Sequence, residues 1–292
     1  MSRMTSRGRA TVRQVCQGFG LSRQAYYATA RPEAAAPAVR RERAGAWATA
    51  AELEAGIKRI VAAHPAWGVR KVWAVLRRAG TIASHKRVWA MMKALGLVLP
   101  PVRERAPEHR RGQVIVPDSN RRWASDLTTV WTSQDGVAAV VPVVDCGDRV
   151  VLSCGVSKSQ EAPFVLAPVA QALEQEFGQP RAVPVGLELL TDHGPQYTGS
   201  DCEQLCKRWQ LDHLLAPVGR PTGNAVAERV ILTMKVELIW TRDWNTIAEL
   251  REAIEQWIVE YNEARPHQAL KWRTPAEQRA ENLKPEDVRQ AA

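Results

Sequence analysis

The spacing of apolar residues divides the chain near residue 120. Before residue 120 the apolar residues recur every three to four positions, which is the period of a helix with one buried face. After it they form short runs typical of strands. Within residues 52–97 this helical period predicts three helices, with Ser84 as a favourable N-cap for the third. Their inward positions are Ile57, Ile60 and Val61; Val69, Val72, Trp73 and Leu76; and Val88, Met91, Met92 and Leu95.

The first fifty residues predict a smaller pair of helices. They occupy residues 11–30, with a turn at 18–20 and the second helix opening at Ser22. Residues 31–39 and 100–107 are rich in breakers and small or charged residues, and predict linkers. We therefore expect four segments: an N-terminal helix-turn-helix and linker at 1–50, a second helix-turn-helix at 51–99, a basic linker at 100–117 and an α/β core at 118–285.

The α/β core begins with strand-forming residues. β-Branched runs at 121–131, 137–144 and 150–156, joined by turn signals at 134–136 and 146–148, predict three antiparallel strands. The elements expected next are a helix at 162–177, a strand ending at Asp192, a helix at 200–209, a strand at 211–216, a helix containing Glu228 and a helix at 246–263. Three strands followed by alternating helices and strands predict a mixed five-stranded sheet with helices, the order of a ribonuclease-H-like fold.

Charge is distributed unevenly along the chain. It has 40 basic and 31 acidic residues, a net charge of +9. Residues 1–117 hold 22 of the basic and 6 of the acidic residues, a net +16, whereas residues 118–292 hold 18 and 25, a net −7. A basic front favours a polyanion such as DNA, and an acidic remainder favours a domain that binds cations.

The third predicted helix of residues 51–99 starts with the best candidates for DNA recognition. His85, Lys86 and Arg87 stand where a recognition helix reaches base edges and phosphates. A small helical bundle with a solvated basic face fits the same pattern, and the +16 charge favours DNA binding. Arg23, near the start of the second N-terminal helix, is a further candidate. Arg220 lies in a predicted loop rich in Pro and Gly. This arginine either contacts a DNA phosphate or belongs to a loop that only connects two elements at the surface.

Three acids have contexts that suit metal-dependent phosphoryl transfer on DNA. Asp126 lies in the first strand, on the face of the small residues Ala124 and Thr128. Asp192 ends an apolar run at a strand tip, and Glu228 follows 36 positions later in a helix. Carboxylates from two strands and a helix can hold two divalent cations, Mg²⁺ or Mn²⁺, about 4 Å apart.

Two polar residues share the helical face of Glu228. Asn224 precedes it by four residues and Lys235 follows it by seven. Seven residues carry Lys235 about 10 Å along the helix, too far for the same cation but suitable for an adjacent phosphate. We expect both residues to contact DNA, and an exposed lysine on a solvated face is the alternative for Lys235.

Asp145 is the main rival to the three acids. It also ends a predicted strand, and it lies near Arg149. It is either a direct metal ligand or, more simply, a residue that fixes a turn or pairs with that arginine.

Five cysteines, an odd number, argue against a disulfide framework. Cys202 and Cys206 are four apart on a predicted helix, with His193 and His213 nearby. A zinc site can be built from these residues, but their spacing fits no established zinc pattern, and small buried cysteines commonly fill cores.

Several motifs together resemble one known family. They are Thr-Asp-His-Gly-Pro-Gln-Tyr at 191–197, the helix 228–235, the tail 261–270 and Thr-Pro at 274–275. Over residues 55 to 280 the chain resembles the integrase-core transposases, most closely the second-frame protein, OrfB, of the IS-three family of bacterial insertion sequences. The resemblance implies a ribonuclease-H-like integrase core in which the three acids are catalytic and bind metal.

The resemblance also implies a function and partners. Such an enzyme binds the terminal inverted repeats of its element, cleaves DNA and joins a 3′-hydroxyl to target DNA, through a circular intermediate. A first-frame protein, OrfA, or a frameshift fusion is the implied partner, and we expect a homo-oligomer on DNA. Thr191 and Gly223 stand where the family usually has Ser and Asp, which affects substrate handling but removes no ligand.

Two other functions stay open at this stage. One is a metal-dependent ribonuclease-H-like nuclease, which would not need the basic front. The other is a domesticated DNA-binding protein without catalysis, against which the presence of all three acids counts. The chain has no run of about 18 apolar residues and no signal-peptide pattern, so we expect a cytoplasmic protein associated with the bacterial nucleoid.

Overall fold

The structure is a computed structural model that describes residues 16–18, 20, 47–100, 116–217 and 224–284. Its contacts divide the chain into two compact units, Met1–Ala46 and Trp47–Ala292. The predicted helix pair at 11–30 and the predicted DNA contact at Arg23 belong to the first unit and, apart from a few positions of that pair, lie outside the described residues. Arg220 also lies outside them.

Three short helices form the predicted helical domain. They are α3 (Ala50–Ala63), α4 (Val69–Arg78) and α5 (His85–Ala94). Thr49 and Glu52 close a capping box at the start of α3, and the Ser84 side chain accepts a hydrogen bond from the Arg87 amide at the start of α5. Their shared core contains Leu53, Ile57, Ile60, Trp67, Val72, Leu76, Val88 and Met92. The helical period and the Ser84 cap are confirmed.

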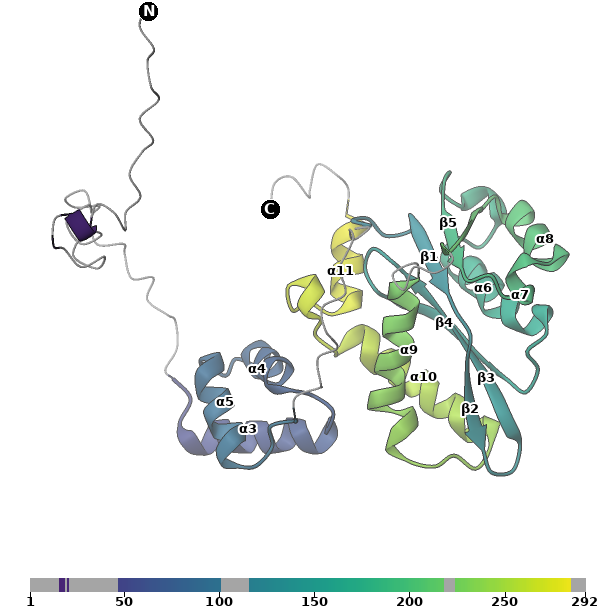
Figure 1. Ribbon diagram of the computed structural model, residues 1–292. Helices are drawn as coiled ribbons and strands as arrows, with labels where there is room; N and C mark the ends of the chain where they lie inside the picture. Colours follow the sequence, from purple (N-terminus) through teal and green to yellow (C-terminus); the bar gives the residue numbers. More distant parts are fainter. Residues whose placement is uncertain (1–15, 19, 21–46, 101–115, 218–223, 285–292) are drawn as a thin grey trace, which may run out of the picture. The chain divides into compact units, whose positions relative to one another are not determined.

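A mixed sheet forms the centre of the α/β core (Figure 1). Its strands are β1 (Arg122–Ser125), β2 (Thr128–Thr132), β3 (Gly136–Asp145), β4 (Val151–Ser157), β5 (Glu188–Thr191) and β6 (Asp212–Leu215). β1, β2 and β4 all pair with β3 in antiparallel fashion, while β1, β5 and β6 pair in parallel. The predicted meander and the mixed sheet are confirmed.

The first predicted strand is interrupted, which corrects the expectation of one continuous strand at 121–131. β1 and β2 pair with β3 in a single register, Ser125 with Val143 and Thr128 with Val140. That register sets Asp126 opposite Pro142, whose nitrogen has no hydrogen to donate to a ladder. Asp126 therefore follows the end of β1 instead of lying within a strand.

Helices cover both faces of the sheet (Figure 1). One core joins β3 and β5 to α6 (Ala162–Phe177), the short α7 (Pro195–Thr198) and α8 (Ser200–Trp209), with η1 (Pro180–Ala182) beside them. The other joins β3 and β4 to α9 (Ala225–Glu237) and α10 (Ile247–Glu263), with η2 (Ile239–Thr241) between these helices. The helix predicted at 246–263 is α10, and its buried residues form an apolar stripe that packs into this core: Ile247, Leu250, Ile254, Trp257 and Tyr261.

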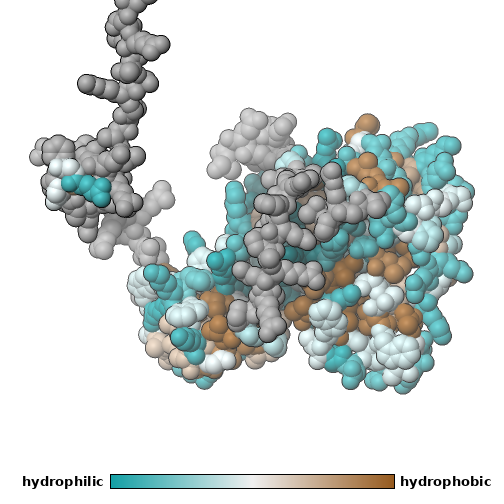
Figure 2. Space-filling view, viewed as in Figure 1, coloured by the Kyte–Doolittle hydropathy of each residue, from teal (hydrophilic) through white to brown (hydrophobic). Residues whose placement is uncertain are grey.

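Two further helical segments, η3 (Gln268–Leu270) and α11 (Pro275–Asn282), follow α10. Thr274 and Glu277 form a second capping box at the start of α11. The space-filling view in Figure 2 shows hydrophobic patches bordered by hydrophilic side chains over the α/β core. Among the described helices none is long and apolar enough to cross a membrane.

Candidate active site at the carboxyl ends of β1 and β5

Asp126 and Asp192 follow two neighbouring parallel strands. β1 and β5 pair with Ala124 opposite Leu190, a register that continues to set Asp126 beside Asp192. Because the two strands run the same way, both aspartates emerge at the same edge of the sheet. The predicted position of Asp192 at a strand tip is confirmed, since β5 ends at Thr191.

Glu228 approaches the same edge from the first turn of α9. The residue that starts this helix, Asn224, is buried, and its side-chain amide donates a hydrogen bond of 3.0 Å to the carbonyl of Ser125. Buried Ala227 packs against Ala124 and Leu190. The start of α9 is therefore fixed to the strand ends that carry the two aspartates.

The charges of the three acids act on one another. The pKa of Asp126 is raised to about 6, chiefly by burial and also by the negative charges of Asp192 and Glu228. A hydrogen bond from the Leu127 amide and the charge of Lys235 oppose the rise. Asp192 and Glu228 are exposed. Like charges that crowd a half-buried carboxyl are the arrangement expected of a site that binds cations.

The start of α9 also carries a buried oxygen without a hydrogen-bond partner. Asn224 Oδ1 is buried and is the one such side-chain atom among the described residues that lacks a hydrogen-bond partner. Unsatisfied buried oxygens are rare in folded proteins, and Mg²⁺ and Mn²⁺ prefer oxygen ligands. The three carboxylates are not all within 4.8 Å of one another, since the described residues contain one such group and it lies elsewhere. The three carboxylates therefore do not converge on a single point in this structure.

Two hydrogen bonds hold the last residues of β1 and β5 in place. The Ser125 hydroxyl lies 3.0 Å from the buried Tyr197 hydroxyl, and the Thr191 hydroxyl lies 2.9 Å from His213 Nε2. Each pair holds the residue just before one of the two aspartates. Tyr197 is the last residue of the motif at 191–197, so the sequence pointed to it as a residue of the site. No pattern in the sequence identified His213 as the partner of Thr191.

The polar neighbours of Glu228 differ from each other. Lys235 is half-buried, and its charge reaches Asp126, so it borders the site as expected. Asn224 is only 4% exposed, which corrects the expectation that it faces DNA. Its amide is used to hold α9 against β1.

Asp145 belongs to a different cluster. Its side chain is fully buried, and it accepts hydrogen bonds from the amides of Asn120 and Gly147. Arg279 of α11 forms ion pairs with Asp145 at 3.2 Å, with Asp148 at 2.7 Å and with Glu176. Asp145 therefore fixes a turn, as the simpler alternative predicted, and the cation that pairs with it is Arg279 instead of Arg149.

The predicted recognition residues lie at the start of α5. His85 and Lys86 are exposed and Arg87 is half-buried. The His85 ring lies edge-on to Trp73 of α4, 6.2 Å between centroids. All three are thus available on the first turn of the helix, where a helix-turn-helix would contact DNA.

Comparison with known proteins agrees with this architecture. The family described as HTH-like domain matches residues 48–105, and families described as integrase core domain match residues 117–221 and 209–275. A cryo-electron microscopy structure of a simian T-cell lymphotropic virus intasome, in complex with a PP2A regulatory subunit, has a chain with the same fold. It is 17% identical, with a TM-score of 0.50, over 76% of this chain and 75% of that chain.

The sequence relatives are nearer. Transposase InsD for insertion element IS2A/D/F/H/I/K of Escherichia coli is 32% identical over 234 residues, 76% of this chain and 76% of the relative. Transposase InsD for IS2-9 of Escherichia coli strain K12 is equally identical, over 74% of its length. With the integrase core and the HTH-like region both matched, the chain belongs to the IS-three family of insertion-sequence transposases.

Proposed function

We propose that this transposase cleaves DNA at the ends of its insertion sequence and joins the freed 3′-hydroxyl to target DNA, with Asp126, Asp192 and Glu228 as metal ligands. The observation that carries the proposal is the crowding of the half-buried Asp126 by two carboxylates at one sheet edge. Such crowding costs free energy unless a cation offsets it.

The three carboxylates favour Mg²⁺, with Mn²⁺ as a substitute, because both ions prefer oxygen ligands. Bound divalent cations supply Lewis acidity that activates a water or 3′-hydroxyl and stabilises the leaving oxygen. Asp126 and Asp192 at the strand ends and Glu228 at the start of α9, which Asn224 fixes to β1, are the residues that would hold those cations. Asn224 is a positioning residue, because its side-chain amide holds the start of α9 against β1.

Lys235 is proposed to bind a DNA phosphate beside the reacting one. It follows Glu228 by two turns of α9, so it lies about 10 Å along the helix axis. Arg220 precedes α9 in the sequence and is proposed as a second phosphate contact.

Recognition of the element ends is assigned to residues 51–99, and catalysis to residues 118–285. His85, Lys86 and Arg87 are the proposed contacts, and the net charge of +16 in residues 1–117 supports this division. Arg23 is proposed as an additional contact in the N-terminal segment. Charge reversal by Lys86→Glu and Arg87→Glu is expected to weaken duplex binding. A plot of the logarithm of the binding constant against the logarithm of the salt concentration should also become less steep, by about one for each phosphate that the variant no longer neutralises. Lys58→Glu, on the exposed side of α3, is the matched control and should leave both unchanged.

The decisive assay uses duplexes that carry the terminal repeats of the element and a target duplex, with Mg²⁺. A transposase yields products in which the 3′ end is covalently joined to another strand. A nuclease of the same fold would yield cleaved ends alone, and a DNA-binding protein without catalysis would yield neither. Absence of joined product under all metal conditions, with DNA binding intact, would overturn the proposal.

The assembly on DNA is part of the proposal. We expect a homo-oligomer that brings two element ends together, aided by a first-frame partner protein or by a frameshift fusion with it. Sedimentation of the protein with one and with two end duplexes measures this, and a monomer on paired ends would contradict it.

A further inference from the structure

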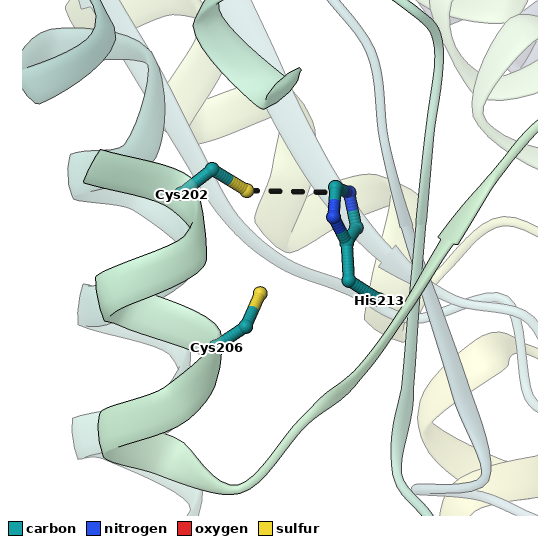
Figure 3. A group of neighbouring side chains, drawn as sticks. All are labelled: Cys202, Cys206 and His213. Atoms are coloured by element: carbon teal, nitrogen blue, oxygen red, sulfur yellow. Dashed lines mark hydrogen bonds between the residues drawn. The ribbon is translucent and has the colours of Figure 1, made fainter. Parts of the chain in front are cut away.

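Two cysteines and a histidine converge on one side of the sheet, outside the carboxylate site (Figure 3). Cys202 and Cys206 lie one turn apart on α8 and point toward His213 of β6. Both cysteines are buried, and His213 is half-buried. The three candidate ligand atoms all lie within 4.8 Å of one another, the one such group among the described residues.

These distances are close to those of a zinc site. Zn–S bonds of about 2.3 Å and Zn–N bonds of about 2.0 Å in a tetrahedron separate the ligand atoms by roughly 3.5–3.8 Å. Cys202 Sγ lies 4.0 Å from His213 Nε2, so a shift of about half an ångström brings them to bonding positions. His193, the other histidine weighed for this cluster, points elsewhere and bonds the carbonyl of Ala216 at 2.8 Å.

The backbone fixes the two elements that carry these ligands. Gln210 adopts a left-handed conformation at the end of α8, and the Leu211 amide bonds the carbonyl of Cys206 at 2.9 Å, which turns the chain directly into β6. β6 then pairs with β5, with His213 opposite Leu189. A histidine eleven residues after Cys202 is thereby held against the cysteine pair without a linear zinc motif.

One side of the cluster is open. A pocket of about 440 Å³ is lined by Cys206 and His213 together with Tyr197, Glu203 and Lys207. Three protein ligands with a fourth position open to solvent are typical of zinc sites that exchange a ligand, whereas a closed structural site has four. A water or a small anion is the fourth ligand that this pocket admits.

One hydrogen bond joins His213 of the cluster directly to β5 of the candidate active site. His213 Nε2, the nitrogen nearest Cys202, is also the atom that lies 2.9 Å from the Thr191 hydroxyl. Thr191 is the last residue of β5, and its hydroxyl also contacts the carbonyl of Asp192 at 3.1 Å. A metal bound at Nε2 must end the hydrogen bond to Thr191, because this nitrogen serves one partner at a time, as a donor when protonated and as an acceptor when not.

We propose that Cys202, Cys206 and His213 form a zinc-binding site whose occupancy releases Thr191 and lowers strand joining. Each thiol loses its proton to solvent as its thiolate binds the ion, and neutral His213 donates its Nε2 lone pair. Zinc binding is independent of the proposed function, whereas its effect on joining rests on that function.

Metal binding is tested on the full chain, kept reduced with a phosphine, by titration with Zn²⁺ and with Co²⁺. One equivalent should bind to thiolates, measured for Co²⁺ as thiolate-to-metal charge-transfer absorption, which ions at the carboxylate site do not produce. Cys202→Ser and Cys206→Ser should each lose affinity by about 100-fold or more, because removal of an outer-shell partner alone costs up to that factor. Cys154→Ser, a half-buried cysteine on β4, is the matched control and should bind as the wild type does.

Asp126→Asn separates this site from the carboxylate site and should leave zinc affinity unchanged. Folded wild-type protein that takes up no thiolate-bound metal would overturn the proposal, as would full affinity in Cys206→Ser. The coupling is measured as joining in Mg²⁺ with and without one equivalent of Zn²⁺. We expect reversible loss in the wild type and none in Cys206→Ser, and equal inhibition of both proteins would overturn the coupling.

Discussion

The chain contains two clusters of acids at opposite ends of the four-residue strand β1, and they differ in what offsets their charge. At one end, Asp145 lies beside Asp148 and Glu176 with Arg279 among them. At the other, Asp126 lies beside Asp192 and Glu228, with Lys235 as the cation whose charge reaches it. The charges of the first cluster are offset by Arg279, and the second cluster is the proposed site for cations from solution.

The pKa of the central aspartate does not distinguish the two clusters. Burial is the largest cause in both, a neighbouring carboxylate adds to it, and the pKa rises to about 6 for Asp126 and for Asp145. Their partners do distinguish them: Asp145 accepts from two backbone amides and Arg279, whereas Asp126 accepts from the Leu127 amide. A cluster of carboxylates with few positively charged or hydrogen-bonding partners is thus a better guide to a metal site than a shifted pKa.

The largest expected effect is loss of chemistry without loss of fold. Asp126→Asn, Asp192→Asn and Glu228→Gln should each lower strand joining by about 10³-fold or more, since metal ions supply several kcal/mol to such reactions. Melting temperature and DNA affinity should stay close to the wild type. Asp201→Asn, an exposed acid on α8, is the control and should join normally. More than trace joining by any of the three variants, in Mg²⁺ or Mn²⁺, would show that the ligand is misassigned.

Arg279→Met should produce the opposite result, a large loss of stability. It leaves Asp145, Asp148 and Glu176 without their cation, and breaking such a buried pair costs about 3–5 kcal/mol. Arg78→Met removes a guanidinium that pairs with exposed Glu277 and should cost less than about 1 kcal/mol. Urea unfolding of both variants measures the difference, and equal costs would mean that the buried cluster is no structural unit.

Lys235 gives a smaller, selective effect. Lys235→Glu should lower joining about tenfold or more, because a charged hydrogen bond to phosphate contributes about 1.5–3 kcal/mol. Lys235→Arg should keep most of the activity, and the Mg²⁺ concentration for half-maximal rate should be unchanged in both. Joining by the glutamate variant at the wild-type rate would assign Lys235 to a solvated helix face.

The smallest effect is a pH-dependent change in stability. Folding raises the pKa of Asp126 from 3.8 to about 6, so this group favours the folded state at low pH, and its contribution is lost as pH rises from 3.8 through 6. Without divalent metal, Asp126→Asn should therefore melt higher than the wild type at pH 8 and nearly equally at pH 4. Mg²⁺ should narrow the gap by stabilising the wild type alone. A difference in melting temperature that does not depend on pH would contradict the raised pKa of Asp126.

Local signals in the sequence predicted much of the fold. The helix expected at 162–177 is α6, residue for residue, because its apolar period is bounded by a stop at Gly178. The Ser84 cap, the stripe of α10 and the strand tip at Asp192 follow from neighbours within a few positions. The local contexts of the three acids, together with the family resemblance, predicted that they meet, although Asp126 was expected within a strand and follows the end of β1.

Features that depend on distant partners were missed. The break after β1 reflects Pro142, sixteen residues beyond Asp126, and becomes visible only with the register of β3 known. Arg279 lies 134 residues from Asp145, so the nearby Arg149 was the natural but incorrect choice. The burial of Asn224 likewise depends on contact with a carbonyl 99 residues away, which no helical periodicity reveals.

The position of Arg279 has a consequence for synthesis of the chain. Asp145 and Asp148 leave the ribosome about 130 residues ahead of the arginine that neutralises them. Until Arg279 of α11 has been translated, burial of the carboxylates in the turn after β3 costs free energy that no cation offsets. We therefore expect this end of the sheet to remain exposed to solvent in the nascent chain. Maturation of the enzyme is thereby tied to near-completion of its own translation, and a chain truncated before residue 279 should be recognised by cellular proteases as unfinished.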